Sequence, residues 1–423
     1  MNVLLFLIII LAIIVFIGIT NEKIFHIQSD IALIMFSVII ALVLVVISRF
    51  FTIAPLEKFI QNIGEFGFEE YLMDGVLCFM LFAGSCHLKL SDFKRQARQV
   101  TVLAFVCTLL GACFYGLLFY GAAYLMGLNL SLPMCLMFGS IVAPTDPIAA
   151  TSILNKFGLP KNISFLIEGE SLFNDGVGVA LFVCFSGLAT ATSSSGFFSV
   201  MLPQIFGAVA VGAVATLLLF PLYRFTKSNT LGIFVSLLSV ALSYYLCELF
   251  GFSGAIASVV CGIVFAALRS KFCPQEDTEK AERFGSFWET LDTLLNSVLY
   301  IMLGFSFVRI MQMEHVILLA LVAIAANLIA RSGSLSLSTL IMGRLPDGYD
   351  KFNFVRLLTW GGLRGGLSVA LAMSTREMIS EDIYFIILGG TYAIVFFTTV
   401  IQGLTMKPVY QRIDRSVSKR NSK

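Results

Sequence analysis

The stretch Ser140-Ile-Val-Ala-Pro-Thr-Asp-Pro147 is the most informative part of this chain. It lies in an apolar segment long enough to cross a bilayer, yet it holds an ionisable residue, Asp146, between two prolines. The next apolar segment contains Glu168-Gly-Glu-Ser-Leu-Phe-Asn-Asp-Gly176 and therefore places Asp175 in the same kind of environment. A charged side chain at the bilayer centre costs at least about 2.5–3.5 kcal/mol. We interpret Asp146 and Asp175 as residues that bind a cation, carry a proton, or do both.

The composition is that of an integral membrane protein. Of the 423 residues, 58% are hydrophobic and only 13% are charged, whereas soluble proteins contain about 25% charged residues. Apolar segments fill almost the whole chain, so there is no room for a soluble catalytic domain. The net charge of +2 gives no reason to expect nucleic acid as a partner. The nine cysteines fall almost entirely in the apolar segments and are interpreted as small buried residues.

Charges and helix breakers predict thirteen transmembrane helices. They cover about residues 3–20, 31–48, 70–88, 99–126, 130–153, 162–192, 199–222, 230–250, 252–268, 288–309, 314–342, 353–374 and 383–406. Of the 28 Lys and Arg residues, 22 fall in one alternating set of loops and tail, and 4 fall in the opposite set. Basic residues favour the cytoplasmic side. We therefore predict a cytoplasmic C-terminus, with a short basic tail at 407–423, and an N-terminus outside the cell.

Two of the predicted helices are interrupted in corresponding places. Pro144 and Pro147 remove backbone donors from the fifth helix beside Asp146, so its hydrogen-bond ladder must open there. The twelfth helix carries Gly361-Gly-Leu-Arg-Gly-Gly366, and glycine weakens a helix by about 1 kcal/mol per residue. If helices 1–6 and 8–13 are two repeats, the interruptions fall in the fifth helix of each, and the repeats are inverted. This arrangement is typical of secondary transporters that bind their substrate at mid-membrane.

The residues around Asp146 and Asp175 predict an ion site made of oxygen atoms. Four polar residues of the sixth helix are spaced to share one side of it, namely Glu170, Ser171, Asn174 and Asp175. Facing the opened backbone at Thr145 and Asp146, they would offer carboxylate, amide, hydroxyl and carbonyl oxygens. Such a cage suits a hard cation, and two carboxylates that share a site of low dielectric can also bind a proton. A site that holds a sodium-sized ion or a proton, one at a time, is an exchanger.

Two arginines fall inside predicted helices and need partners. Arg331 can be neutralised by Glu170, since otherwise the site would contain three acids close together. Arg364, within the glycine-rich interruption, is suited to the exposed carbonyl ends of the half-helices. For both arginines, an ion pair that only stabilises the bundle is an alternative. Weaker polar candidates are Asn296 and Ser297 in the tenth helix and Glu69, Glu70 and Asp74 at the outer end of the third.

Together these segments resemble the sodium/proton exchanger branch of the cation:proton antiporters, in particular the prokaryotic NhaP-type proteins. The matching segments are Ala143–Pro147, Glu168–Gly176, Asn296-Ser-Val-Leu-Tyr-Ile-Met-Leu-Gly304 and Trp360-Gly-Gly-Leu-Arg-Gly-Gly-Leu-Ser368. The resemblance implies an all-α NhaA/NhaP-like fold over residues 1–406, with crossed broken helices and a homodimer. It further implies a core domain of about helices 4–6 and 11–13, a dimerisation domain from the other helices, and alternating access by movement of the core.

Carried over to this sequence, the resemblance also assigns roles. Asp146 and Asp175 become the ion and proton carriers, with Ser171 and the Thr145 backbone as further Na⁺ ligands. Asn174 becomes a supporting polar group, and Glu170–Arg331 a structural ion pair. Electrogenic relatives have a second acid at the position of Asn174, so the resemblance implies electroneutral exchange. Some relatives also have an acid in the third helix, where this chain reads Met80-Leu-Phe-Ala-Gly-Ser85.

The sequence thus predicts a cell-membrane antiporter, not an enzyme, that exchanges Na⁺ or Li⁺ for H⁺ and needs no cofactor. Potassium/proton exchange is the main alternative. A cation channel would show filter segments or acid rings, and none is visible. An intramembrane aspartyl protease is the most distant alternative, because the two aspartates lack the Gly-x-Gly-Asp context that it requires.

Overall fold

The computed structural model describes residues 3–50, 76–87, 90–146, 150–151, 154–155, 157–190, 197–273, 278–310, 316–343, 345 and 349–421. Within these ranges every regular element is a helix. In chain order the helices are α1 (Val3–Thr20), η1 (Asn21–Phe25), α2 (Ser29–Phe50), α5 (Leu77–Cys86), α6 (Leu90–Thr101), η3 (Val102–Cys107), α7 (Thr108–Leu125), α8 (Leu132–Val142), α10 (Lys161–Ala189), α11 (Phe197–Phe225), α12 (Asn229–Leu249), α13 (Gly254–Phe272), α14 (Thr278–Ile310), α15 (Val316–Met342), α16 (Lys351–Trp360), α17 (Gly366–Ser374), η4 (Thr375–Glu377), α18 (Glu381–Phe396), η5 (Phe397–Gln402) and α19 (Gly403–Asn421).

The prediction of an all-helical membrane protein is confirmed. Eight helical stretches among the described residues are long and apolar enough to cross a membrane. Three shorter apolar helices accompany them, at Ser29–Leu44, Leu77–Cys86 and Leu132–Val142. Much of the third predicted helix, including Glu69, Glu70 and Asp74, lies outside the described residues. The total of thirteen therefore stays a prediction.

The interruptions expected in two helices are both present. Helix α8 ends at Val142, and residues 143–146 are not helical. Helix α16 ends at Trp360. Residue 361 forms a turn, and residues 362–365 are a non-helical link to α17. The two links touch each other, because Asp146 N donates a hydrogen bond to Leu363 O over 2.7 Å. Backbone groups released by one interruption are thus satisfied partly by the other, as burial away from water requires.

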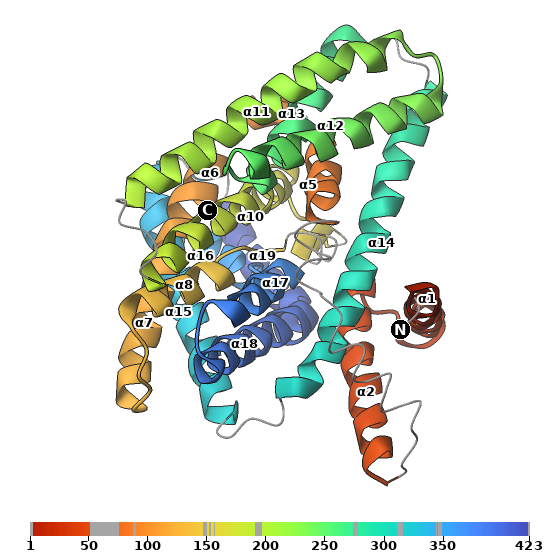
Figure 1. Cartoon of the computed structure of the whole chain (residues 1–423). Helices are drawn as coiled ribbons and strands as arrows, with labels where there is room; N and C mark the ends of the chain where they lie inside the picture. The colour runs from red at the N-terminus through yellow and green to blue at the C-terminus, as the bar shows by residue number, and fades with distance from the viewer. Residues whose placement is uncertain are drawn as a thin grey trace.

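Close approach of helix backbones sets the packing. A Cβ atom at Gly139 of α8 would lie 2.0 Å from the Ala112 carbonyl oxygen of α7, and a Cβ at Gly304 of α14 would lie 1.8 Å from Ser37 Oγ of α2. Only glycine fits at these crossings, which is the way small residues commonly bring membrane helices together. In Figure 1, α11, α12 and α13 gather at one end of the molecule and α7, α8, α15, α17 and α18 lie away from them, with α14 running along one side.

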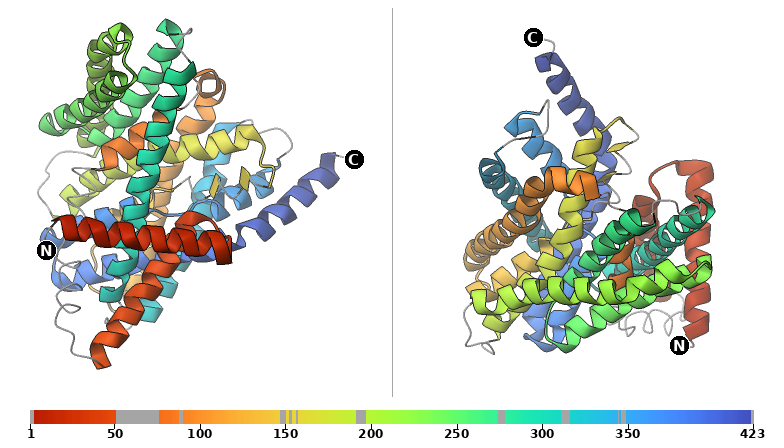
Figure 2. Two further views of the ribbon diagram at one scale, coloured as in Figure 1. Left: turned by 90° about the vertical axis from the view of Figure 1, so that its right-hand side faces the viewer. Right: turned by 90° about the horizontal axis from the view of Figure 1, so that it is seen from above.

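The last helix extends further than the sequence indicated. Residues after 406 were expected to be a short tail, but α18, η5 and α19 form one continuous helical stretch that includes Glu381–Val417. Four buried residues spaced three or four apart explain the extension, because they give α19 one apolar face; they are Met406, Tyr410, Ile413 and Val417. This face packs against α16 and belongs to the same buried cluster as Leu154, Leu159 and Ile163. Both views of Figure 2 show the end of α19 projecting from the rest of the molecule.

Candidate functional site

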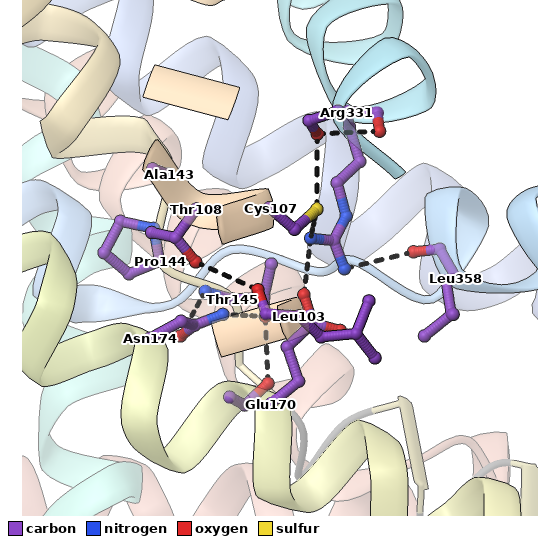
Figure 3. A network of polar contacts seen from close by, with 12 residues as sticks. Leu103, Cys107, Thr108, Ala143, Pro144, Thr145, Glu170, Asn174, Arg331 and Leu358 are labelled. Carbon is purple, nitrogen blue, oxygen red and sulfur yellow. Dashed lines mark hydrogen bonds and ion pairs between the residues drawn. The ribbon is translucent and has the colours of Figure 1, made fainter. Parts of the chain in front are cut away.

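The opened backbone after α8 is attached to α10 by one amide side chain. Asn174 Oδ1 accepts a hydrogen bond from Thr145 N over 3.2 Å, and Asn174 Nδ2 donates to Thr145 Oγ1 over 2.7 Å. Thr145 Oγ1 also lies 2.9 Å from Ser171 Oγ, one turn earlier on α10. Figure 3 shows Thr145 and Asn174 side by side within this network. All three side chains are buried. The network therefore holds residues 143–146 in place and gives the Thr145 N–H group a partner that the interrupted helix cannot supply.

Asp146 and Asp175 line the same cavity, which has a volume of about 400 Å³. Asp146 enters from the link after α8, and Asp175 enters from α10, one residue beyond Asn174. The remaining lining residues come from these two regions and from four others in the described chain: Leu77, Met80, Leu81, Gly84, Pro144, Thr145, Thr151, Asn155, Glu168, Leu172, Asp292, Asn296, Leu299, Gly365, Gly366, Leu367 and Ser368. None of them is lysine or arginine. The cavity therefore has four carboxyl groups and no basic side chain among its described lining residues.

The third acid of the α10 motif points to a different environment. Glu170 Oε1 lies 2.5 Å from Arg331 Nη1 of α15, and the two side chains are only 1% and 6% exposed. Arg331 also donates to Cys107 Sγ over 3.7 Å and to Leu358 O over 3.5 Å. Neither partner of the ion pair lines the cavity. Burying two charges is costly unless each has a well-placed opposite charge and further hydrogen bonds, and this arrangement supplies both.

Arg364 connects the two interruptions. Its Nη1 donates to the carbonyl oxygens of Ala143 and Pro144, the latter over 2.8 Å, and its Nη2 donates to Asn327 Oδ1 over 3.1 Å. A helix that ends at Val142 leaves carbonyls without helical partners. The guanidinium group donates hydrogen bonds to two carbonyls just beyond this helix end.

Two threonines of η5 hold the backbone at the same point. Thr398 Oγ1 accepts from Arg364 N over 3.1 Å, and Thr399 Oγ1 donates to Arg364 O over 3.1 Å. Both backbone groups of Arg364 are thus satisfied by hydroxyl partners from η5.

The remaining sequence candidates differ in position. Asn296 lines the cavity, whereas Ser297 Oγ donates to Thr293 O of its own helix over 2.7 Å. The segment without an acid in the third helix contributes Met80, Leu81 and Gly84 to the lining. Ser171 and Asn174 stand behind Thr145 and are not among the lining residues.

The sequence reasoning missed two direct contacts. The Tyr300 hydroxyl of α14 donates to Asp146 Oδ2, and Asn327 is the side chain that meets Arg364. Tyr300 lies in the segment Asn296–Gly304, which resembles the exchanger family, but no pattern in this segment indicates that its tyrosine contacts Asp146. Asn327, four residues before Arg331, gives a helical-spacing signal that could have placed both on one face of α15.

Comparison with known proteins agrees with this geometry. A family model described as the transmembrane sodium/hydrogen exchanger matches residues 63–412. The Na⁺/H⁺ antiporter NhaP of Pseudomonas aeruginosa is 31% identical over 351 residues, which are 82% of each chain. The Na⁺/H⁺ antiporter NhaH of Halobacillus dabanensis is 30% identical over 354 residues, 82% of this chain and 84% of the relative.

The fold is also that of a solved structure. The sodium proton antiporter MjNhaP1 from Methanocaldococcus jannaschii superposes with a TM-score of 0.71 at 20% identity, over 96% of this chain and 97% of that one. At this identity the likeness concerns the fold. The family match, the close relatives and the many membrane-spanning helices lead to one conclusion: the chain belongs to the sodium/hydrogen exchanger family and is a multi-pass membrane transporter, not an enzyme.

Proposed function

We propose that this protein exchanges Na⁺ or Li⁺ for H⁺, with Asp146 and Asp175 as the groups for which cation and proton compete. The observation that carries the proposal is the cavity of about 400 Å³ that both carboxylates line. None of the described lining residues is basic, and a carboxylate in such a cavity attracts either a cation or a proton. Because both ligands need the same oxygens, binding one excludes the other, and alternating access then couples their opposite movements.

The remaining ligands are proposed from the same neighbourhood. Na⁺ is a hard cation that prefers oxygen, and Thr145 supplies backbone oxygen at the opened link. The Ser171 hydroxyl lies 2.9 Å from Thr145 Oγ1 and is close enough to join a cation there after a small rearrangement. Asn174 supports the link through its two hydrogen bonds to Thr145. The Na⁺ site would thus consist of Asp146, Asp175, Ser171 and Thr145.

We propose that the exchange is electroneutral and one-for-one, as the resemblance implies, and the distribution of charge supports this. Glu170 is neutralised by Arg331 at 2.5 Å, and Asn174 has no proton to release. The two aspartates are then the carriers at the site. One Na⁺ in one direction and one H⁺ in the other leave no net charge movement.

We infer that the described conformation opens towards the cytoplasm. The cavity is lined by Asn155 and Glu168, which lie on either side of Lys156 and Lys161 in the sequence, and by Asp292, which follows the segment 269–283 with its four Lys and Arg residues. Both loops belong to the set rich in Lys and Arg, which the charge distribution places inside the cell. Acidic walls raise the local cation concentration, so Glu168 and Asp292 would recruit Na⁺ to the cavity.

The wider architecture belongs to the same proposal. Thirteen helices in two inverted repeats, a core of about helices 4–6 and 11–13, and a homodimer through the other helices would allow the core to move against a fixed scaffold. The N-terminus would lie outside and the C-terminus inside the plasma membrane. Helix α19 would then continue from the last transmembrane helix into the cytoplasm.

The test is ion exchange in everted membrane vesicles that contain the protein. Addition of Na⁺ or Li⁺ should dissipate an imposed pH gradient, as followed by a fluorescent pH probe. Vesicles without the protein serve as the control, and K⁺ is tested in parallel because potassium/proton exchange uses the same oxygen chemistry. A response to K⁺ with none to Na⁺ or Li⁺ would replace the proposed substrate. No response to any of the three would remove the proposal.

A further inference from the structure

A tyrosine on a helix without an interruption reaches the proposed ion site. The Tyr300 hydroxyl of α14 donates a hydrogen bond to Asp146 Oδ2, and the tyrosine side chain is 1% exposed. The two residues are 154 positions apart in the chain. A hydrogen bond to an ionised carboxylate is among the stronger ones in proteins, so this contact contributes to the state of Asp146.

Tyr300 is held by a part of the molecule separate from the link that carries Asp146. Ser37 Oγ of α2 donates to Tyr300 O over 3.4 Å. One turn further along α14, the backbone at Gly304 approaches the same serine so closely that no side chain fits between them. Helices α2 and α14 therefore form a rigid pair at this level. In the proposed function both helices belong to the scaffold, whereas Asp146 belongs to the moving core.

The neighbouring residue of α14 contacts the second interruption. A Cβ atom at Gly366, the first residue of α17, would lie 2.0 Å from Leu299 Cδ2. Leu299 also lines the cavity. Two successive residues of α14 thus touch both interrupted helices, Leu299 through packing and Tyr300 through a hydrogen bond. If the core moves relative to α14, both contacts must open.

The surroundings of Asp146 show why one hydroxyl donor matters there. Asp30 of α2 and Asp292 of α14 are close enough to act on Asp146 electrostatically, and both are acids. Oδ2 also faces Gly365, where a Cβ atom would lie 3.0 Å away. Tyr300 therefore directs the positive end of its O–H dipole to a carboxylate oxygen that has two other acids nearby.

Resting on the proposed function, we propose that Tyr300 is a positioning residue that competes with the transported cation for Asp146. A cation at Oδ2 would face the hydroxyl hydrogen, so the hydroxyl must turn away or withdraw before the cation binds. The phenol thereby sets the cation affinity in this conformation. It also links occupation of the site to release of the core from α14.

The first test is Tyr300→Phe, which removes the hydroxyl and keeps the ring. Na⁺ titrations in everted vesicles at one fixed pH would give the apparent KM and the maximal rate. We expect the apparent KM for Na⁺ to fall by about 10-fold, which corresponds to the loss of about 1.4 kcal/mol of competition, with no fall in the maximal rate. An unchanged KM would overturn the proposal, and a raised KM would make the hydroxyl a cation ligand instead of a competitor.

Tyr115→Phe is the matched control. Tyr115 of α7 is also 1% exposed, and its hydroxyl has no hydrogen-bond partner in the part of the chain that the structure describes. Removing this buried hydroxyl should leave the KM for Na⁺ unchanged. If the KM for Na⁺ falls by a similar factor in both variants, the effect comes from general loosening of the helix bundle, and the specific role of Tyr300 is refuted.

A second variant keeps the proposal testable if the phenylalanine protein does not fold. Tyr300→3-fluorotyrosine, introduced by suppression of a stop codon, keeps the shape and strengthens the O–H donor, so the KM for Na⁺ should rise. A fall or no change would contradict the competition. These variants test the role of Tyr300 on the condition that the unmodified protein exchanges Na⁺ for H⁺. Absence of exchange in the unmodified protein would instead refute the proposed function itself.

Discussion

Glu170 and Asp175 are two acids on the same helix, five residues apart, with opposite surroundings. Glu170 is 1% exposed and paired with Arg331 at 2.5 Å. Asp175 lines the cavity, and none of the described lining residues is basic. Five residues turn a helix by about 140° beyond one full turn, so the two carboxylates leave α10 in different directions. The expectation that Glu170 shares one side of the helix with Asp175 was therefore wrong. The comparison teaches that burial of an acid in a membrane protein does not reveal its role: the neighbouring charge does.

The largest effect should come from removing the cavity acid. Asp175→Asn keeps the side-chain shape but cannot exchange a proton for a cation, so Na⁺-driven dissipation of a pH gradient should fall to the level of empty vesicles. Thermal unfolding of the purified protein should show that it still folds, because no ion pair is lost. Full exchange by this variant would remove Asp175 from the mechanism.

Removing the paired acid should instead affect stability. Glu170→Gln leaves Arg331 buried without its carboxylate, and breaking a buried pair in this way costs about 3–5 kcal/mol. We expect a clearly lower unfolding temperature in detergent. The double variant Glu170→Gln with Arg331→Gln should recover part of that loss, since it leaves no unpaired charge. Equal stability of the single variant and the unmodified protein would show that the pair is not structural.

Glu168 allows a sharper comparison, because it lies on α10 and lines the cavity without belonging to the proposed ligands. Its Oε1 accepts from Ser164 Oγ over 2.9 Å. Glu168→Gln should raise the KM for Na⁺ only about two- to threefold, through a weaker local potential. The effect should shrink as ionic strength rises, since added salt screens the charge. A loss of exchange as complete as in Asp175→Asn would place Glu168 among the carriers.

The smallest expected effect concerns the residue beside Asp175. Both polar atoms of the Asn174 amide are hydrogen-bonded to Thr145, and an amide does not release a proton in this pH range. Exchange by the unmodified protein should therefore be electroneutral. In proteoliposomes whose membrane potential is set with potassium and valinomycin, the Na⁺/H⁺ exchange rate should not change with the potential. A rate that follows the potential would show that the one-for-one ratio is wrong.

Local chemistry explains which parts of the site were predictable. Pro144 lacks an N–H group, and the glycines around Arg364 weaken a helix, so the interruptions could be located from the sequence. The partners expected for the two arginines followed from the need of a buried guanidinium for a carboxylate or for free carbonyl oxygens. The structure places Arg331 on Glu170 and Arg364 on the carbonyls before Asp146. The π-helical segments η3 and η5 were not predicted, because an apolar segment has the same composition whether its hydrogen bonds skip four residues or five.

The sequence by itself determined that the chain crosses a membrane, where its helices break, and which acids it holds in apolar segments. These properties depend on single residues and on neighbours within a few positions. Only the tertiary structure decided that Asp146 and Asp175 share one cavity and that Tyr300 bonds to Asp146. It also decided which oxygen atoms each arginine meets. The physical reason is distance along the chain: Glu170 and Arg331 are 161 positions apart, and Tyr300 and Asp146 are 154 apart. No local periodicity fixes the rotation of one helix against another over such separations, whereas close packing at residues such as Gly139 and Gly304 does.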